Sequence, residues 1–137
     1  MDIKHLLKTL IDRQASDLHL LVGSPAFSRV DGVLKPLEGE SPLTAQSAKE
    51  LIFPLLTSAQ KDVFLVNKEL DFSVELGDLG RFRVNVYFQR GFMAAALRLI
   101  PAKIRTIDEL NLPPILHDFT KLSQGFVLIV GPAGHGK

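Results

Sequence analysis

The sequence contains no cysteine, almost no net charge and no long apolar run, and each absence excludes a class of protein. Without cysteine the chain forms neither disulfides nor thiolate metal sites, which suits a reducing compartment. A formal net charge of +1 provides no general attraction to nucleic acid or to an anionic membrane. No apolar stretch approaches the ~20 residues of a membrane helix, and Met1–His5 lacks the basic flank and apolar segment of a signal peptide. With 137 residues, 46% of them apolar, we expect a globular protein with a substantial core.

The last twelve residues combine an apolar run with a glycine-rich loop. The run Phe126–Val130 predicts a strand buried on both faces, as in a parallel sheet. It leads into Gly131-x-x-x-x-Gly136-Lys137, which fits the phosphate-binding loop of nucleoside triphosphatases except for the hydroxyl residue that should follow. Glycines let successive backbone N–H groups surround a phosphate, and the lysine brings a positive charge to its outer oxygens. The candidate nucleotide-binding residues are Gly131, Pro132, Ala133, Gly134, His135, Gly136 and Lys137.

Much of what such a loop needs for hydrolysis would follow Lys137. The helix that completes the anion site, the hydroxyl that holds Mg²⁺ and the acidic residue for the metal all come later in this class of enzyme. We therefore expect a parent ATPase that uses ATP and Mg²⁺, with the metal ligands beyond this chain, and expect these 137 residues alone to be inactive. His135 could sense nucleotide, although a solvent-facing side chain is the favoured interpretation.

The first hundred residues alternate between helical and strand patterns. Apolar residues at helical spacing, with acidic or hydroxyl residues at the caps, predict helices over 3–13, 44–53 and 57–66. Alternating apolar and polar residues predict strands over 17–22, 26–30, 33–36, 70–76, 81–90 and 93–100. The Asp31–Gly32 pair between two of these strands is typical of a hairpin turn. The pattern predicts an α/β (α+β) domain.

The longest strand pattern also predicts a register with the strand that follows it. A two-residue turn at Arg90–Gly91 pairs apolar residues with apolar residues across the two strands. The expected pairs are Phe82 with Leu99, Val84 with Leu97, Val86 with Ala95 and Phe88 with Met93. On the opposite face this register places Arg83 directly across from Arg98. A shift by one residue would set Arg98 against an apolar side chain and break the row.

Residues 101–113 are expected to link this domain to the phosphate-loop region. Pro101 stops the preceding strand, and the stretch that follows is polar and ends at Pro113–Pro114. Thr106 and Glu109 stand in capping-box positions, and a second short helix is expected over 113–121.

Five segments together resemble one family. Ser16–Leu20, Gly80–Val86, Gln89–Gly91, Ala95–Pro101 and Gly131–Lys137 occur in this order and at matching spacing. They resemble the N-terminal part of the type IV pilus retraction ATPases, the PilT family of twitching-motility proteins, within the type II/IV secretion ATPases. The chain departs from that family at two loop positions, because Ala133 and His135 stand where it usually has hydroxyl residues.

The resemblance implies a fold and a cellular setting. It implies a PAS-like domain over residues 1–100, with an antiparallel sheet and flanking helices, a linker over 101–113, and over 114–137 the first strand of a RecA-like ATPase domain, truncated at the Walker A lysine. Such proteins form homo-hexamers in the cytoplasm, peripheral to the inner membrane, where they act with an inner-membrane platform protein of the pilus machinery. They use ATP to pull pilin subunits out of the fibre, without nucleic acid and without inserting into the membrane.

The resemblance also implies a catalytic role for Arg83 and Arg98, since secretion ATPases use arginines of this sheet to reach the outer phosphate of ATP. The alternative from the residues themselves is that both arginines extend into water or pair with Asp71 or Glu75. Like charges directly opposite each other are destabilising unless a negative group lies nearby.

Other functions stay open at this point. A pilus extension or type II secretion ATPase of the same family would carry the same segments, and a PAS-like module could bind a ligand or partner without hydrolysis. A different phosphate-loop enzyme, such as a kinase, would leave the β-rich region unexplained. His19 and Asp17 are expected to be ordinary outward-facing residues of one strand.

Overall fold

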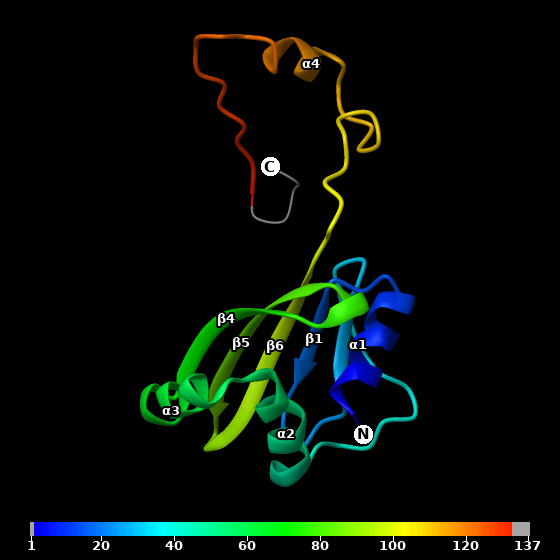
Figure 1. The fold of residues 1–137 in the computed structure, drawn as a ribbon. Coiled ribbons are helices and arrows are strands. Elements are labelled where there is room, and N and C mark those ends of the chain that lie inside the picture. The colour runs from blue at the N-terminus through cyan, green and yellow to red at the C-terminus, as the bar shows by residue number, and fades with distance from the viewer. Residues whose placement is uncertain (1, 133–137) are drawn as a thin grey trace. The chain divides into compact units, whose positions relative to one another are not determined.

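The computed structural model describes residues 2–132, and the chain divides into two compact units, Met1–Ala102 and Lys103–Lys137 (Figure 1). Each unit is described by itself.

The first unit is built on one antiparallel sheet of six strands in the order β3-β2-β1-β6-β5-β4. The strands are β1 (Asp17–Leu20), β2 (Phe27–Val30), β3 (Val33–Pro36), β4 (Glu69–Glu75), β5 (Arg81–Gln89) and β6 (Phe92–Ile100). The hairpin partners β2 and β3 flank β1 on one side. On the other side β1 pairs with β6, which lies far away in the sequence.

Three helices accompany the sheet: α1 (Ile3–Asp12), α2 (Ala45–Ile52) and α3 (Ser58–Asn67), with short 3₁₀ turns at Phe53–Leu55 and Gly77–Leu79. Each helix begins where a side chain satisfies a free backbone N–H. The Asp2 carboxylate accepts from the Lys4 N–H in α1, and Thr44 and Thr57 form capping boxes with Ser47 and Gln60 in the other two. The expected helices are confirmed, with ends that differ by one or two residues.

The core lies on one face of the sheet. Buried residues of α1, α2 and α3 form a single apolar cluster with those of the strands (Figure 1). The strand residues in this cluster include Leu18, Leu20, Phe82, Val84, Val86, Ala95 and Leu97. The predicted register is confirmed in full, because Phe82 pairs with Leu99 and Arg83 with Arg98. The period-2 alternation therefore leaves a second, polar face of the same sheet without a helix over it in the described part of the first unit.

Residues 103–132 of the second unit contain one short helix, α4 (Ile115–Phe119), within the expected range. Before α4, the Thr106 hydroxyl accepts from the Glu109 N–H and the Glu109 carboxylate accepts from the Thr106 N–H, so the expected capping box is present. No helix in the described residues is long and apolar enough to cross a membrane.

The expectation of a buried strand at Phe126–Val130 is wrong for the structure of this chain. These five residues are exposed and have no strand assignment. A strand needs a partner for its backbone N–H and C=O groups, and the described residues of the second unit include no other strand. The five residues are apolar, as the prediction requires, but each stays at least 45% exposed in the described part of this unit.

Candidate functional site

A line of polar residues crosses the open face of the sheet. Register pairing places Arg29 beside Asp17, Asp17 beside Arg98, Arg98 beside Arg83 and Arg83 beside Ser73, on five neighbouring strands. The two arginines proposed from the sequence are therefore direct cross-strand neighbours at the centre of this line.

Asp17 is the most enclosed member of the line, with a side chain only 7% exposed. Its carboxylate accepts a hydrogen bond from the Ser16 hydroxyl at 2.7 Å and one from the Arg98 Nε at 2.7 Å. The Arg29 Nε lies 3.4 Å from the second carboxylate oxygen. Burial raises the pKa of Asp17, but the hydrogen bonds from Ser16 and Arg98 and the charge of Arg98 outweigh it, and the pKa lies below its ordinary value. Asp17 is therefore a buried anion between two cations.

Arg83 makes the second ion pair, with Asp71 of the edge strand β4. Its Nε and Nη2 both donate to the Asp71 carboxylate, and Nη2 lies 2.6 Å from Oδ2. Both partners are exposed, at 67% for Arg83 and 42% for Asp71. The hydrogen bond from Arg83, helped by its charge, holds the pKa of Asp71 below its ordinary value.

These two ion pairs remove the repulsion expected between Arg83 and Arg98. Each guanidinium is neutralised on the side away from the other, one by the strand β4 and one by the strand β1. The sequence alternative that Arg83 pairs with Asp71 is confirmed. For Arg98 the expected partners, Asp71 and Glu75, are wrong, because Arg98 pairs with Asp17. The expectation that Asp17 is an ordinary outward-facing residue is therefore also wrong.

A hollow of about 240 Å³ lies between the two ion pairs. His19, Ala96 and Asn85 follow one another across the strands in the next row, and all three line it. The small side chain of Ala96 between two larger ones leaves this space open. Burial lowers the pKa of His19, and its buried Nε2 has no hydrogen-bond partner in the described part of the chain. The same burial favours the neutral form of the His19 imidazole.

The other candidate residues lie at the end of the chain. Gly131 and Pro132 are described and exposed. Ala133, Gly134, His135, Gly136 and Lys137 lie outside the described residues. Within residues 2–132 no group of three or more histidine, cysteine or acidic side chains is placed to hold a metal ion.

Comparison with known proteins identifies relatives along the whole chain. The chain is 36% identical over 137 residues to a type IV pilus retraction ATPase, PilT, of Pseudomonas aeruginosa and 32% identical to a type IV pilus ATPase, PilU, of the same organism. Both alignments cover the whole of this chain. The chain spans only 40% of that PilT and 36% of that PilU. A crystal structure of the pilus retraction motor PilT with bound ADP matches 98% of this chain and 39% of its own, with a TM-score of 0.80 and 34% identity. No protein-family model matches the chain.

Proposed function

The chain is homologous over its whole length to type IV pilus ATPases, and from this we propose that it is the N-terminal part of a motor ATPase that drives pilus retraction. Among the relatives compared, the one named for retraction shares slightly more identity, 36% against 32%. Because the chain spans about 40% of that relative, ATP hydrolysis and pilus movement are proposed for the longer protein that carries it.

In this function each of the two units has its own role. The first unit is a PAS-like domain, and the second begins a RecA-like ATPase domain in which Gly131–Lys137 binds the phosphates of ATP. Support comes from the loop motif and from the ADP in the matched PilT structure. We further propose a cytoplasmic ring of six copies that works on an inner-membrane platform protein. We propose that the Mg²⁺ ligands follow Lys137 in the longer protein.

Arg83 and Arg98 are proposed to contact the outer phosphate of ATP. The observation that carries this is their geometry: two neighbouring guanidiniums on an open sheet face, 67% and 70% exposed although both are paired. A planar guanidinium can donate two parallel hydrogen bonds to a phosphate and keeps its charge at every physiological pH. Closure of the first unit over a nucleotide would bring both charges to the oxygens on which negative charge develops.

Breaking the ion pair of Arg83 and breaking that of Arg98 are expected to cost different amounts of free energy. The Arg83 partner, Asp71, is exposed, so water can replace the guanidinium there. The Arg98 partner, Asp17, is buried, so removing Arg98 takes the nearer of two cations away from an enclosed anion. We therefore expect Arg83 to act on catalysis alone and Arg98 to act on both catalysis and stability.

The test is ATP turnover of the full-length protein. Arg83→Ala should lower turnover on the order of a thousandfold, the usual effect of losing an arginine that stabilises a transferring phosphate, with an unchanged urea midpoint. Arg98→Ala should lower turnover as well and also lower the midpoint. Arg81→Ala is the matched control, since Arg81 lies on the same face of β5 and donates to Ser73. Wild-type turnover in both variants, with folding intact, would refute the catalytic role.

The alternatives separate by phenotype and by sequence. Deleting the gene should leave fibres that no longer retract. Loss of the fibres would favour a pilus extension ATPase, and loss of protein export would favour a type II secretion ATPase.

The hollow beside His19 favours one further candidate, a PAS-like module that binds a small ligand without hydrolysis. Serine or threonine encoded directly after Lys137, followed by an amphipathic helix, would support the motor, and a stop codon there would support the module.

A further inference from the structure

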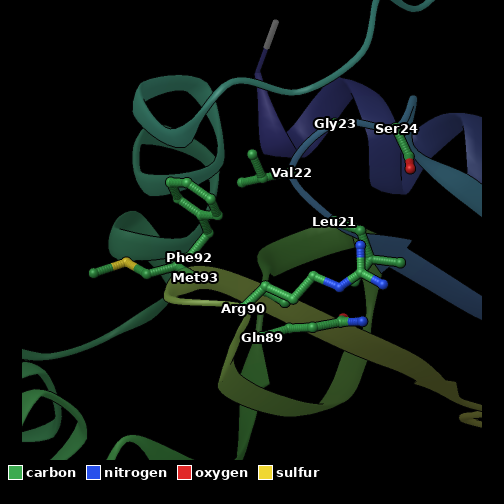
Figure 2. Close-up of a pocket in the computed structure, with 9 residues that line it drawn as sticks. Leu21, Val22, Gly23, Ser24, Gln89, Arg90, Phe92 and Met93 are labelled. Carbon is green, nitrogen blue, oxygen red and sulfur yellow. The ribbon is translucent and has the colours of Figure 1, made fainter.

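A second pocket lies apart from the arginine pairs, at the end of the sheet where β5 turns into β6. Its volume is about 410 Å³, within the range of small-ligand sites. One wall is the segment after β1, residues 21–24, and the other is the β5–β6 hairpin (Figure 2). The hairpin residues that line it are Gln89, Arg90, Phe92, Met93 and Ala94.

The lining divides into a polar and an apolar part. Figure 2 shows the polar ends of Arg90 and Gln89 on the side of Leu21, and the Phe92 ring on the side of Val22. None of the residues that line the pocket is acidic. In the described part of the chain Arg90 takes part in none of the observed ion pairs or side-chain hydrogen bonds, in contrast to Arg29, Arg83 and Arg98. The pocket therefore holds an uncompensated positive charge next to apolar surface.

The backbone holds Arg90 in this place. It has φ 52° and Gly91 has φ 82°, so both turn residues are left-handed, as a two-residue hairpin turn requires. Asparagine, aspartate and glycine adopt this conformation most easily, and arginine does not. The turn geometry alone thus gives no reason for an arginine, whereas a binding role for its side chain does.

The opposite wall is also fixed. The Gly23 N–H donates to the Leu43 carbonyl at 2.8 Å, and the Leu43 N–H donates to the Ser24 carbonyl at 2.9 Å. Leu43 itself is buried in the core. A ligand would therefore meet a preformed pocket, which reduces the entropy lost on binding.

We propose that this pocket binds a carboxylate that carries an apolar group, either a free small acid or the C-terminus of a peptide. The fork of a guanidinium matches the two oxygens of a carboxylate, and the Gln89 amide can donate beside it. One positive charge balances a carboxylate, while a phosphate dianion would stay undercompensated. Phe92 and Val22 would cover the attached apolar group. Binding in this pocket would not depend on nucleotide hydrolysis.

The test is an NMR titration of the ¹⁵N-labelled chain with N-acetylphenylalanine. Signals of residues 21–24 and 89–94 should shift with a midpoint of about a millimolar, as expected for a ligand of this size. N-acetylphenylalaninamide, which lacks the carboxylate, and acetate, which lacks the ring, should bind far more weakly. Equal binding of the amide would overturn the proposal.

Arg90→Gln should weaken binding by about ten- to a hundredfold, because it removes a charge-assisted hydrogen bond. Phe92→Ala, at a half-exposed position, should weaken it several-fold. Arg13→Gln is the matched control, since it removes the same charge from the exposed end of α1. Wild-type affinity in Arg90→Gln would also overturn the proposal.

A peptide ending in phenylalanine separates the two sources of the carboxylate. Tighter binding of Ala-Ala-Ala-Phe than of N-acetylphenylalanine would assign the pocket to a peptide C-terminus. Exclusion of the peptide with retained binding of the amino acid derivative would assign it to a small acid. Failure of both ligands to shift these signals would refute the shared chemistry.

Discussion

Replacing Asp17 by asparagine tests whether the buried carboxylate holds the polar line of the sheet together. The substitution keeps the size of the side chain and one acceptor oxygen but removes the charge between Arg98 and Arg29. Breaking a fully buried ion pair costs about 3–5 kcal/mol, while a hydrogen bond to a charged group contributes about 1.5–3 kcal/mol. Because Arg98 is 70% exposed and can turn to water, we expect the lower range, a loss of about 2 kcal/mol.

The assay is urea unfolding followed by far-UV circular dichroism. With the urea dependence usual for a domain of this size, a loss of about 2 kcal/mol lowers the midpoint by about 1 M. Asp71→Asn is the matched control, because it makes the same change in an exposed ion pair. Its midpoint should stay close to that of the wild type.

The pH dependence gives a second, independent readout. The pKa of Asp17 in the folded chain lies below its value in the unfolded chain, so the unfolded chain takes up this proton first as the pH falls. The stabilisation by the ionised carboxylate is therefore complete above the unfolded pKa, about 3.9, and is lost as the pH falls through the folded pKa. The difference between wild type and Asp17→Asn should be full at neutral pH and should shrink below about pH 4. Equal effects of the two asparagine variants at neutral pH, or a difference that persists unchanged into acid, would refute the reasoning.

Two further substitutions test the packing around this sheet. The Ser28 hydroxyl is fully buried and has no hydrogen-bond partner in the described part of the chain. Ser28→Ala should therefore raise the free energy of unfolding, measured by urea titration, by about 1 kcal/mol. A marked loss of stability would mean that the hydroxyl does have a hydrogen-bond partner. Thr57→Ala should lower the free energy of unfolding by about 1 kcal/mol, because the Gln60 N–H loses its hydrogen bond to the Thr57 hydroxyl. Thr57→Ser keeps a hydroxyl and should retain most of the stability. Equal stability of the wild type and both variants would show that the cap contributes nothing.

The central hairpin could be predicted from the sequence because its information is local. The Arg90–Gly91 turn fixes the loop length, and the alternation on either side leaves one register in which apolar residues face each other. The capping boxes at Thr44 and Thr57 are local in the same sense, since each pairs residues three positions apart. These elements were predicted to within one or two residues.

The partner of Arg98 could not be predicted because its information is not local. Asp17 lies 81 residues earlier in the chain, and it becomes a neighbour only through the pairing of β1 with β6. A sequence pattern shows that both segments are strands, but it does not give their order in the sheet. The burial of Asp17 follows from that order, because only a central strand has an arginine-bearing strand on both sides.

The same limit explains the error at Phe126–Val130. Composition shows that these residues favour burial, and burial depends on a partner that composition does not supply. The hollow beside Ala96 could not be predicted for the same reason. A small residue leaves a hollow only when its neighbours on both adjacent strands are large, and the sequence does not give those neighbours. His19 and Asn85 satisfy that condition through pairing alone.

Arg29 affects how easily Arg98 could leave Asp17 to contact a phosphate. If Arg98 turned from Asp17 toward a phosphate, the buried carboxylate would keep the Ser16 hydroxyl and the Arg29 guanidinium, whose Nε lies 3.4 Å away. That distance is longer than a charge-assisted hydrogen bond, so Arg29 has room to approach and to replace the lost contact. The arrangement of two arginines on one buried aspartate thus lowers the cost of releasing either of them, which a single ion pair would not do. Arg83 needs no such substitute, since its carboxylate already faces water. If both central arginines contact a phosphate as proposed, Arg83 would leave its carboxylate to water and Arg98 would leave its carboxylate to Arg29.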